Sequence, residues 1–222
     1  MIAIIDYGVG NLRSVEKAFI AIGADAVLTN DINTIKNAQA IVLPGVGAFE
    51  DGMESLKKLG LIEVILEAIS RKTPFLGICL GMQLLLEVGD ESNEAIVNKT
   101  KSNLIDGMAV IKGSVKRFPN IAGLKIPQMG WNTVSYRIGS RLFEGIEQNQ
   151  FFYFVHSYYC ELESEAEVAG LTEYGVLYHS ALEVDNIFAT QFHPEKSGEL
   201  GLKVLKNFVA IATAHSKEEK KC

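Results

Sequence analysis

The residues best suited to chemistry begin with a cysteine held between two glycines. The run GICLG (77–81) follows an apolar stretch and precedes a helical pattern, so Cys79 falls at a predicted strand-to-helix junction. This is the layout of a nucleophile elbow, in which the glycines let a strand and a helix approach a strained nucleophile. A helix N-terminus would also stabilise a thiolate. The pattern alone leaves open a small buried core cysteine.

A histidine followed two residues later by an acid could activate this cysteine. In FHPE (192–195), proline pushes His193 toward extended backbone, so that Glu195 lies on the same side and can reach the imidazole. The carboxylate would fix the tautomer and stabilise the imidazolium, as in a nucleophile–His–acid triad. A structural contact at a strand end is the alternative. The other histidines have no comparable acid partner and are predicted to be structural or surface residues: His156, His179 and His215.

A glycine-containing loop could supply main-chain N–H groups to a reacting carbonyl. The run LPGVG (43–47) follows a predicted strand, and its two glycines would let the backbone approach a substrate closely. With the amide of Leu80, just after the nucleophile, it would form an oxyanion hole, by analogy with hydrolase elbows. By itself such a run is usually just a turn.

The elements that must position these residues follow a parallel α/β pattern in the first half of the chain. Short β-branched runs alternate there with amphipathic stretches. The predicted strands are residues 2–5, 26–28, 40–43 and 75–78. The predicted helices are residues 11–22, residues 53–71 with an interruption at Gly60, and a helix that begins near Leu80.

The second half has a different pattern. The polar stretch 89–103 is predicted to be a surface excursion. The strand-like runs after it have no long helices between them and predict antiparallel additions, at residues 109–111, 131–135, 151–159, 166–170, 176–179 and 187–191. A last helix is expected at about 199–214. Residues 1–215 are therefore expected to form one α/β domain, followed by a charged, solvated tail at 216–222.

Composition limits the class of protein. The chain has 222 residues, 48% hydrophobic and 22% charged, as in an ordinary globular domain. Its net charge of −6, without a basic stripe, argues against nucleic acid as a partner. Its cysteines show no disulfide or metal-ligand spacing, and Cys160 is predicted to be structural and Cys222 an exposed thiol. The N-terminal apolar run ends at Asp6, too short for a signal peptide or a membrane span, so a cytoplasmic location is expected.

Taken together, three segments closely resemble those of class I, triad-type glutamine amidotransferases: PGVGAF (44–49), GICLGMQ (77–83) and QFHPEKS (191–197). Three further runs are similar to the glutaminase subunits of imidazole glycerol phosphate synthases, from histidine biosynthesis: IIDYGVGNLRSV (4–15), PQMGWN (127–132) and VHSYY (155–159). The resemblance extends from the N-terminus to the last predicted helix. Only the excursion and the tail lie outside recognisable motifs.

The resemblance implies a single-domain amidotransferase fold with a central, mostly parallel sheet, flanking helices and an antiparallel extension. It implies that Cys79 is the nucleophile, His193 the general base and acid, and Glu195 its orienter. It assigns further residues to the oxyanion region (Gly45, Val46, Gly47 and Leu80) and to glutamine binding (Gln83 and the Ser157–Tyr158 backbone). It also implies that the enzyme needs no metal or organic cofactor.

The implied reaction begins with thiolate attack on the glutamine carboxamide, which gives a γ-glutamyl thioester and ammonia; water then releases glutamate. Ammonia is largely protonated in neutral water, which favours a sheltered route to a partner. In this family the partner is a (β/α)₈ cyclase in a heterodimer, and the ammonia yields imidazole glycerol phosphate and an aminoimidazole carboxamide ribotide. Asn11, Trp131 and Lys196 are candidates for the docking face, although Trp131 could equally be a core aromatic.

Three alternative functions remain at the level of sequence. The same glutaminase could feed another amidating synthase, such as one of surface-sugar synthesis, and the glutaminase motifs do not separate these two. A cysteine peptidase on a related fold is disfavoured because the HPE and PGVG motifs occur together. An inactive, regulatory glutamine-binding module is disfavoured by the intact Cys79, His193 and Glu195.

Overall fold

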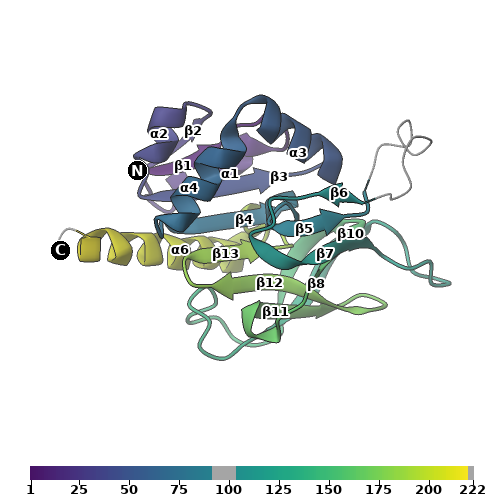
Figure 1. The fold of residues 1–222 in the computed structure, drawn as a ribbon. Helices are drawn as coiled ribbons and strands as arrows, with labels where there is room; N and C mark the ends of the chain where they lie inside the picture. Colours follow the sequence, from purple (N-terminus) through teal and green to yellow (C-terminus); the bar gives the residue numbers. More distant parts are fainter. Residues whose placement is uncertain (92–103, 220–222) are drawn as a thin grey trace.

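The parallel part of the sheet carries the N-terminal half of the protein. The computed structural model describes residues 1–91 and 104–219, and within them thirteen strands form one mixed sheet (Figure 1). Five neighbouring strands, in the order β2-β1-β3-β4-β13, all pair in parallel. These strands are β1 (Ile2–Ile5), β2 (Ala26–Thr29), β3 (Ala40–Gly45), β4 (Phe75–Cys79) and β13 (Ile187–Thr190).

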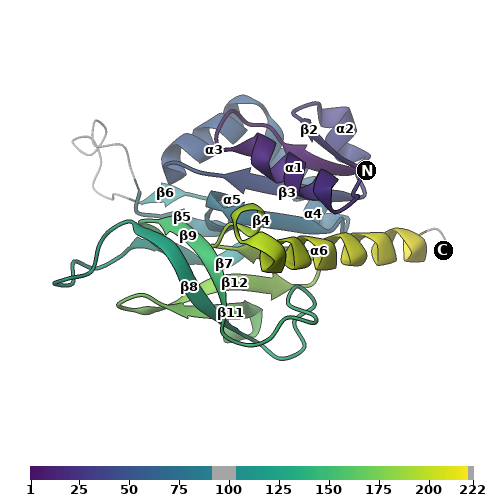
Figure 2. The ribbon, with the colours of Figure 1, turned by 180° about the vertical axis from the view of Figure 1, so that it is seen from behind.

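Helices cover both faces of these parallel strands. Side chains alternate along β1, so Ala3 and Ile5 join a core with helices α2, α3 and α4, whereas Ile2 and Ile4 pack with residues of α1 and α6. Figure 2 shows α1 and α6 on the same side of the sheet. Every residue of β1, β3, β4 and β13 is buried, as expected for parallel strands covered on both sides. The helices are α1 (Leu12–Ala21), α2 (Ile32–Lys36), α3 (Phe49–Lys58), α4 (Leu61–Ser70) and α6 (Gly198–Glu219).

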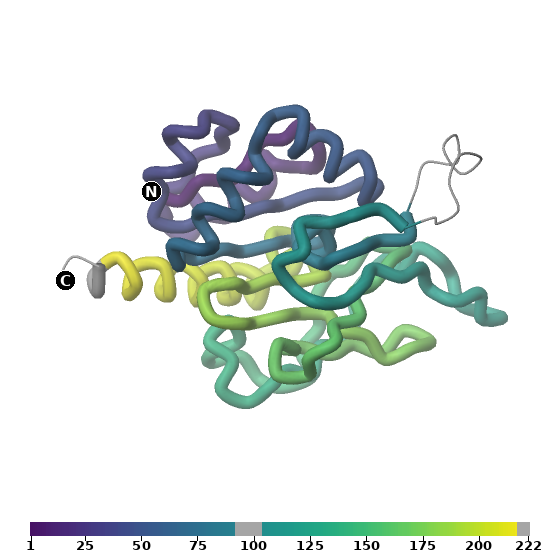
Figure 3. Tube along the Cα trace, in the orientation of Figure 1, coloured from purple at the N-terminus to yellow at the C-terminus, as the bar shows by residue number. Residues whose placement is uncertain are grey.

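The second half of the chain extends the sheet beyond β13. The order continues β13-β12-β10-β7-β5-β6, and β8, β9 and β11 form a flange attached through the β11–β12 pair. Figure 3 shows that α6 returns from this region to the N-terminal half, where it contacts α1. The strands are β5 (Leu86–Gly89), β6 (Ile105–Asp106), β7 (Ile111–Arg117), β8 (Gln128–Tyr136), β9 (Gln150–His156), β10 (Tyr158–Leu162), β11 (Val168–Glu173) and β12 (Leu177–Val184).

The expected α/β architecture is confirmed, but several elements differ. The strand expected at 187–191 as an antiparallel addition is β13. It pairs antiparallel with β12, as expected, and also in parallel with β4, which was not expected. The strand expected at 151–159 breaks at Ser157 into β9 and β10. The expected interruption at Gly60 is confirmed, because this residue adopts φ +66° between α3 and α4. The last helix continues past residue 214 to Glu219.

Other elements were missed because they are short or irregular. Helix α2 has only five residues and begins where the Asp31 carboxylate accepts a hydrogen bond from Thr34 N at 2.7 Å. The strand expected at 109–111 begins instead at Ile111 and continues to Arg117. The positive φ of Ala109, +51°, prevents an earlier start. Gly89 of the expected excursion belongs to β5, and residues 92–103 and Cys222 lie outside the described residues.

A four-residue helix, α5 (Leu80–Gln83), packs directly on the parallel strands. A Cβ atom on Gly81 would lie 1.7 Å from the Leu43 carbonyl oxygen, and one on Gly77 would lie 2.6 Å from the Gly81 carbonyl oxygen. Neither position therefore has room for a side chain, and both neighbours are rigid backbone. This close approach is the one expected of the GICLG motif. Within the described residues, no helix combines the length and apolar character needed to cross a bilayer.

The contact between α5 and β3 predicts a large difference between two glycine substitutions. Gly81→Ala should lower the free energy of unfolding by about 3 kcal/mol or more, because the new methyl group overlaps backbone. Gly23→Ala is the matched control: φ is +77° but nothing lies within 4 Å of the added Cβ. It should cost only about 1–2 kcal/mol of backbone strain. Urea unfolding of both variants measures the difference, and equal losses would contradict the packing argument.

Candidate active site

Cys79 occupies a strained turn between β4 and α5. Its φ of +54° and ψ of −106° are unusual for a residue other than glycine and cost of order 1–3 kcal/mol. The side chain is buried yet borders a cavity. Its sulfur accepts a hydrogen bond from Gln191 Nε2 at 3.5 Å. Cys79 is thus placed as expected for an elbow nucleophile, with the N-terminus of α5 beginning at the next residue.

His193 and Glu195 form a buried pair. The Nδ1–H of His193 donates to Glu195 Oε1 over 2.8 Å, and both side chains are at most 3% exposed. His193 itself is extended, as predicted, but the turn η2 (Pro194–Lys196) is a single 3₁₀ turn. The expected contact therefore forms because the chain folds back after His193, and not because both residues share one side of an extended strand.

The charges around His193 favour its imidazolium form. Burial opposes the charge, but Cys79 and Glu195 together outweigh burial and raise the pKa of His193 from 6.5 to about 10. Because Glu195 engages Nδ1, Nε2 is the nitrogen available to Cys79. The stabilisation from this raised pKa is complete below pH 6.5 and is lost as the pH rises through about 10. The imidazolium form of His193 is therefore favoured at neutral pH.

The PGVG loop lies beside the nucleophile. Gly45 is paired with Cys79 across β3 and β4, and it is buried behind the loop. Val46 and Gly47 are exposed and border the same cavity as Cys79 and Leu80. Gly47 adopts φ +114°, a conformation that side chains rarely permit. The predicted oxyanion residues are thus brought together, with Gly45 supporting the loop from behind.

The cavity, about 510 Å³ in volume, also gathers the predicted substrate-binding residues. Gln83, Ser157 and Tyr158 line it, and Gln83 Nε2 donates to the Tyr158 carbonyl oxygen at 3.0 Å. Lys196, predicted for docking, lies at the same cavity. Cys160 is fully buried in β10, as expected for a structural cysteine.

Two cavity residues with ionisable side chains were not expected there. Glu91, at the start of the polar excursion, accepts a hydrogen bond from Phe49 N at 3.0 Å, and burial raises its pKa. His156, predicted to be structural or at the surface, also lines the cavity. Glu91 lies outside every recognisable motif, so no signal in the sequence separated it from surface acids. Within the described part of the chain, no three His, Cys, Asp or Glu side chains are grouped as metal ligands.

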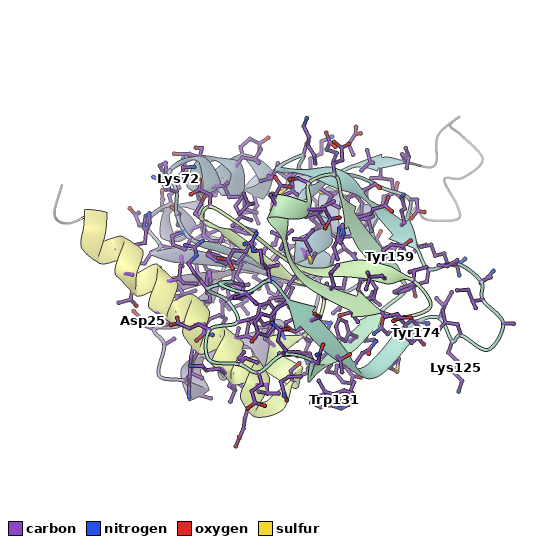
Figure 4. All side chains as sticks on the ribbon, turned by 90° about the horizontal axis from the view of Figure 1, so that it is seen from below. Asp25, Lys72, Lys125, Trp131, Tyr159 and Tyr174 are labelled. Atoms are coloured by element: carbon purple, nitrogen blue, oxygen red, sulfur yellow. The ribbon has the colours of Figure 1, made fainter. Side chains whose placement is uncertain are left out.

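The docking candidates lie on two surfaces near the cavity. Trp131 is 55% exposed and packs edge-on against Tyr153, so it is a surface residue and not a core aromatic (Figure 4). Lys196 Nζ lies 6.0 Å from the centre of the Tyr153 ring. Asn11 is exposed at the start of α1. Its neighbour Gly10 lies against the PGVG loop, where an added Cβ would be 3.4 Å from Val46 N.

The electrostatics predict that the pKa of His193 depends on its two charged neighbours. Cys79→Ala should lower that pKa from about 10, because the variant removes a negative charge while burial continues to oppose protonation. Titration of the His193 Cε1–H resonance by NMR measures the change. Cys160→Ala is the control and should leave the pKa of His193 unchanged. An unchanged value in Cys79→Ala would show that the thiol does not act on the ring.

The chain shares sequence and fold with known amidotransferases. Residues 3–212 match the family described as glutamine amidotransferase class-I. Imidazole glycerol phosphate synthase subunit HisH of Methanothermobacter thermautotrophicus is 51% identical over 214 residues, covering 96% of this chain and 100% of the relative. HisH of Caldanaerobacter subterraneus subsp. tengcongensis is 47% identical over 208 residues, covering 94% and 97%.

Solved structures support the fold. A crystal structure of a glutamine amidotransferase has a TM-score of 0.70 at 16% identity, covering 96% of this chain and all of that one. The structure of PurLQS from Thermotoga maritima has a TM-score of 0.67 at 18% identity, covering 95% and 97%. The family match covers nearly the whole chain, and it includes the elbow, the PGVG loop and the His–Glu pair described above. The chain therefore belongs to the class-I glutamine amidotransferase family.

Proposed function

We propose that this chain is the glutaminase subunit of an imidazole glycerol phosphate synthase, which hydrolyses glutamine and supplies ammonia for histidine biosynthesis. The observation that carries the proposal is the buried Cys79–His193–Glu195 set at the cavity. It occurs in a chain 47–51% identical, over nearly its full length, to subunits named HisH. The family alone would allow several synthases, and the HisH relatives favour this one.

The geometry supports acyl transfer through a thioester. The Cys79 thiolate attacks the carboxamide carbon, and the negative oxygen that develops is stabilised by the amide of Leu80 and the PGVG loop. His193 gives its proton to the leaving nitrogen, so the C–N bond breaks and ammonia departs. His193 then takes a proton from water, which attacks the thioester. The C–S bond breaks, and glutamate and the Cys79 thiol result.

Polar groups around the cavity suit the amino-acid end of glutamine. Gln83 and the Ser157–Tyr158 backbone can hold the substrate's polar groups. The Glu91 carboxylate, also at the cavity, has the charge to bind an α-ammonium group. Its raised pKa reflects burial and the nearby Asp90 and Asp51, and an ammonium group there would relieve that repulsion. We therefore assign Glu91 to substrate binding together with Gln83.

An exposed apolar stripe next to the cavity supports a protein partner, which we propose is the (β/α)₈ cyclase subunit in a heterodimer. Met129 and Trp131 on β8 lie opposite Val155 and Tyr153 on β9, and Phe151 extends the stripe. Met129, Trp131 and Phe151 are 66%, 55% and 55% exposed. Val155 also lines the cavity, so a partner seated on the stripe would border the site where ammonia forms.

The other functions differ from this one in what they predict. A glutaminase for surface-sugar synthesis would not rescue a histidine auxotroph that lacks its own glutaminase subunit, whereas this chain should. A peptidase would cleave peptides, and an inactive binding module would not release glutamate. A cytoplasmic location is proposed as well, and the unpaired state of the buried Cys79 and Cys160 is consistent with a reducing compartment.

Substitution of the nucleophile should separate chemistry from folding. Cys79→Ala should reduce glutamate release to background while leaving the unfolding transition largely unchanged, because the elbow cysteine contributes chemistry more than core volume. Cys160→Ala should retain activity, since Cys160 is buried in β10 and does not line the cavity. Glutamate release is measured with a coupled assay. Wild-type turnover by Cys79→Ala would mean that another group is the nucleophile.

Hydrolysis by the isolated chain should be slow and should rise strongly when the cyclase and its nucleotide-like substrate are added. The physical reason is the loop: Gly45 and Gly47 flank Val46, so the peptide between them can change orientation at low cost and complete the oxyanion hole in the complex. Full activity of the isolated chain at saturating glutamine would contradict this latency.

The docking face should be visible in the same assay. Trp131→Ala and Lys196→Ala should weaken activation by the cyclase about tenfold or more, because central aromatic and charged side chains dominate most interfaces. Ile138→Ala is the matched control, since Ile138 is 92% exposed and lies away from the cavity and the stripe. Undiminished activation of both Trp131→Ala and Lys196→Ala would place the interface elsewhere.

A further inference from the structure

A buried chain of hydrogen bonds runs along the wall of the substrate cavity. It begins at Gln128 of β8, opposite His156 in the β8–β9 pair. The hydroxyl of Tyr178 lies 3.0 Å from the Gln128 side-chain oxygen and 3.3 Å from His156 Nε2. On the other side of the ring, His156 Nδ1 lies 2.8 Å from the Tyr158 carbonyl oxygen. Gln128, His156 and Tyr178 are all at most 7% exposed.

The partners determine the tautomer of His156. A carbonyl oxygen can only accept, so Nδ1 carries the proton and donates to Tyr158. Burial lowers the pKa of His156 to about 4, so the ring is neutral at neutral pH and Nε2 is an acceptor. Tyr178 can then donate to Nε2. Rotation of the Gln128 amide, whose nitrogen is buried without a partner, would let that nitrogen donate to Tyr178 in turn.

The Tyr158 carbonyl, which ends this series of hydrogen bonds, lies at the corner where the polypeptide passes from β9 to β10. His156 is the last residue of β9 paired with β8, and Tyr158 is the first residue of β10 paired with β7. The polypeptide therefore crosses from the flange to the main sheet at Ser157, and this residue lines the cavity. The Ser157 carbonyl is held by Phe118 N at 3.0 Å. The Tyr158 carbonyl is held by two donors, His156 and Gln83.

The same carbonyl connects the corner to the nucleophile. Gln83 Nε2 donates both to the Tyr158 carbonyl oxygen at 3.0 Å and to Gln191 Oε1 at 3.1 Å. Gln191 Nε2 then donates to Cys79 Sγ at 3.5 Å. A shift of the Tyr158 carbonyl would therefore disturb Gln83 directly and Cys79 only through Gln83 and Gln191. The effect should be strongest on the part of the cavity that holds the substrate.

We infer that His156 is a positioning residue for glutamine binding: its Nδ1–H fixes the Tyr158 carbonyl, and thereby Gln83 and the Ser157–Tyr158 wall, while Tyr178 and Gln128 hold its tautomer. The role rests on the proposed glutaminase function. His156 does not take part in proton transfer, which belongs to His193. Its loss should weaken glutamine binding and raise KM, with a smaller effect on kcat, because Cys79, His193 and Glu195 keep their own contacts.

Two near-isosteric substitutions isolate the hydrogen bond. His156→Asn keeps an amide N–H close to the position of Nδ1, whereas His156→Leu has a similar volume and no donor. Both lose the contact with Tyr178 and leave a similar space, so a purely structural role would affect them equally. His179→Asn is a control outside the cavity: His179 lies on β12 and its Nδ1 accepts from Leu162 N at 2.9 Å.

Glutamine binding is measured by calorimetry in the Cys79→Ala background, and KM and kcat in the Cys79 form. We expect His156→Leu to raise Kd and KM about tenfold, the size of one lost hydrogen bond, with kcat within threefold of wild type. His156→Asn and His179→Asn should stay within about threefold of wild type. Equal Kd values for His156→Asn and His156→Leu would overturn the proposal. A wild type that neither binds nor hydrolyses glutamine would instead overturn the proposed function.

A second measurement covers the case in which His156→Leu does not fold. Nitrogen-15 NMR of histidine-labelled wild-type protein reports which ring nitrogen carries the proton. His156 should be neutral and protonated at Nδ1 from about pH 6 to 8, and its Nδ1–H resonance should move when glutamine is added to the Cys79→Ala variant. A ring protonated at Nε2, or a resonance that glutamine does not perturb, would overturn the role assigned to His156.

Discussion

The site depends on the absence of side chains where α5 packs on β3 and β4. Gly77 and Gly81 let backbone meet backbone, and the chain can turn there only if Cys79 adopts φ +54°. That turn places the sulfur at the carboxyl end of β4, between the two neighbouring parallel strands. β3 delivers the PGVG loop and β13 leads to His193. Three adjacent strand ends thus bring together the proposed oxyanion loop, nucleophile and base, as carboxyl ends of parallel strands commonly do.

Burial gives this arrangement its electrostatic character. A lone imidazolium in this environment would lose its proton, because desolvation disfavours the charge. The neighbouring Cys79 and Glu195 reverse that preference, so the charged state of His193 depends on both partners being in place. The same burial has the opposite result at His156: no acid among the described residues offsets the desolvation, and its pKa falls to about 4. The two buried histidines therefore favour opposite charge states.

Local chemistry could be predicted from the sequence, and long-range pairing could not. The spacing of GICLG reflects a steric requirement within five residues, and the HPE contact lies within three. The parallel pairing of β13 with β4 was not predicted because apolar periodicity is the same in parallel and antiparallel strands. Glu91 and His156 reach the cavity through tertiary contacts with Phe49 and Tyr178, which no local pattern encodes. The sequence left open whether Trp131 is a core or a surface residue. In the structure its side chain is 55% exposed, so it lies at the surface.

The cavity lies at the seam between the two halves of the sheet. One wall is made by the ends of β3 and β4, and the other by the corner where β9 passes into β10. That corner continues the strand pair that carries the apolar stripe, so the proposed docking and substrate-binding surfaces share β9. Shared elements do not by themselves transmit a signal, because coupling requires an element with two states. We propose the PGVG loop on the first wall as this element, whereas the hydrogen-bonded corner forms the opposite wall of the cavity.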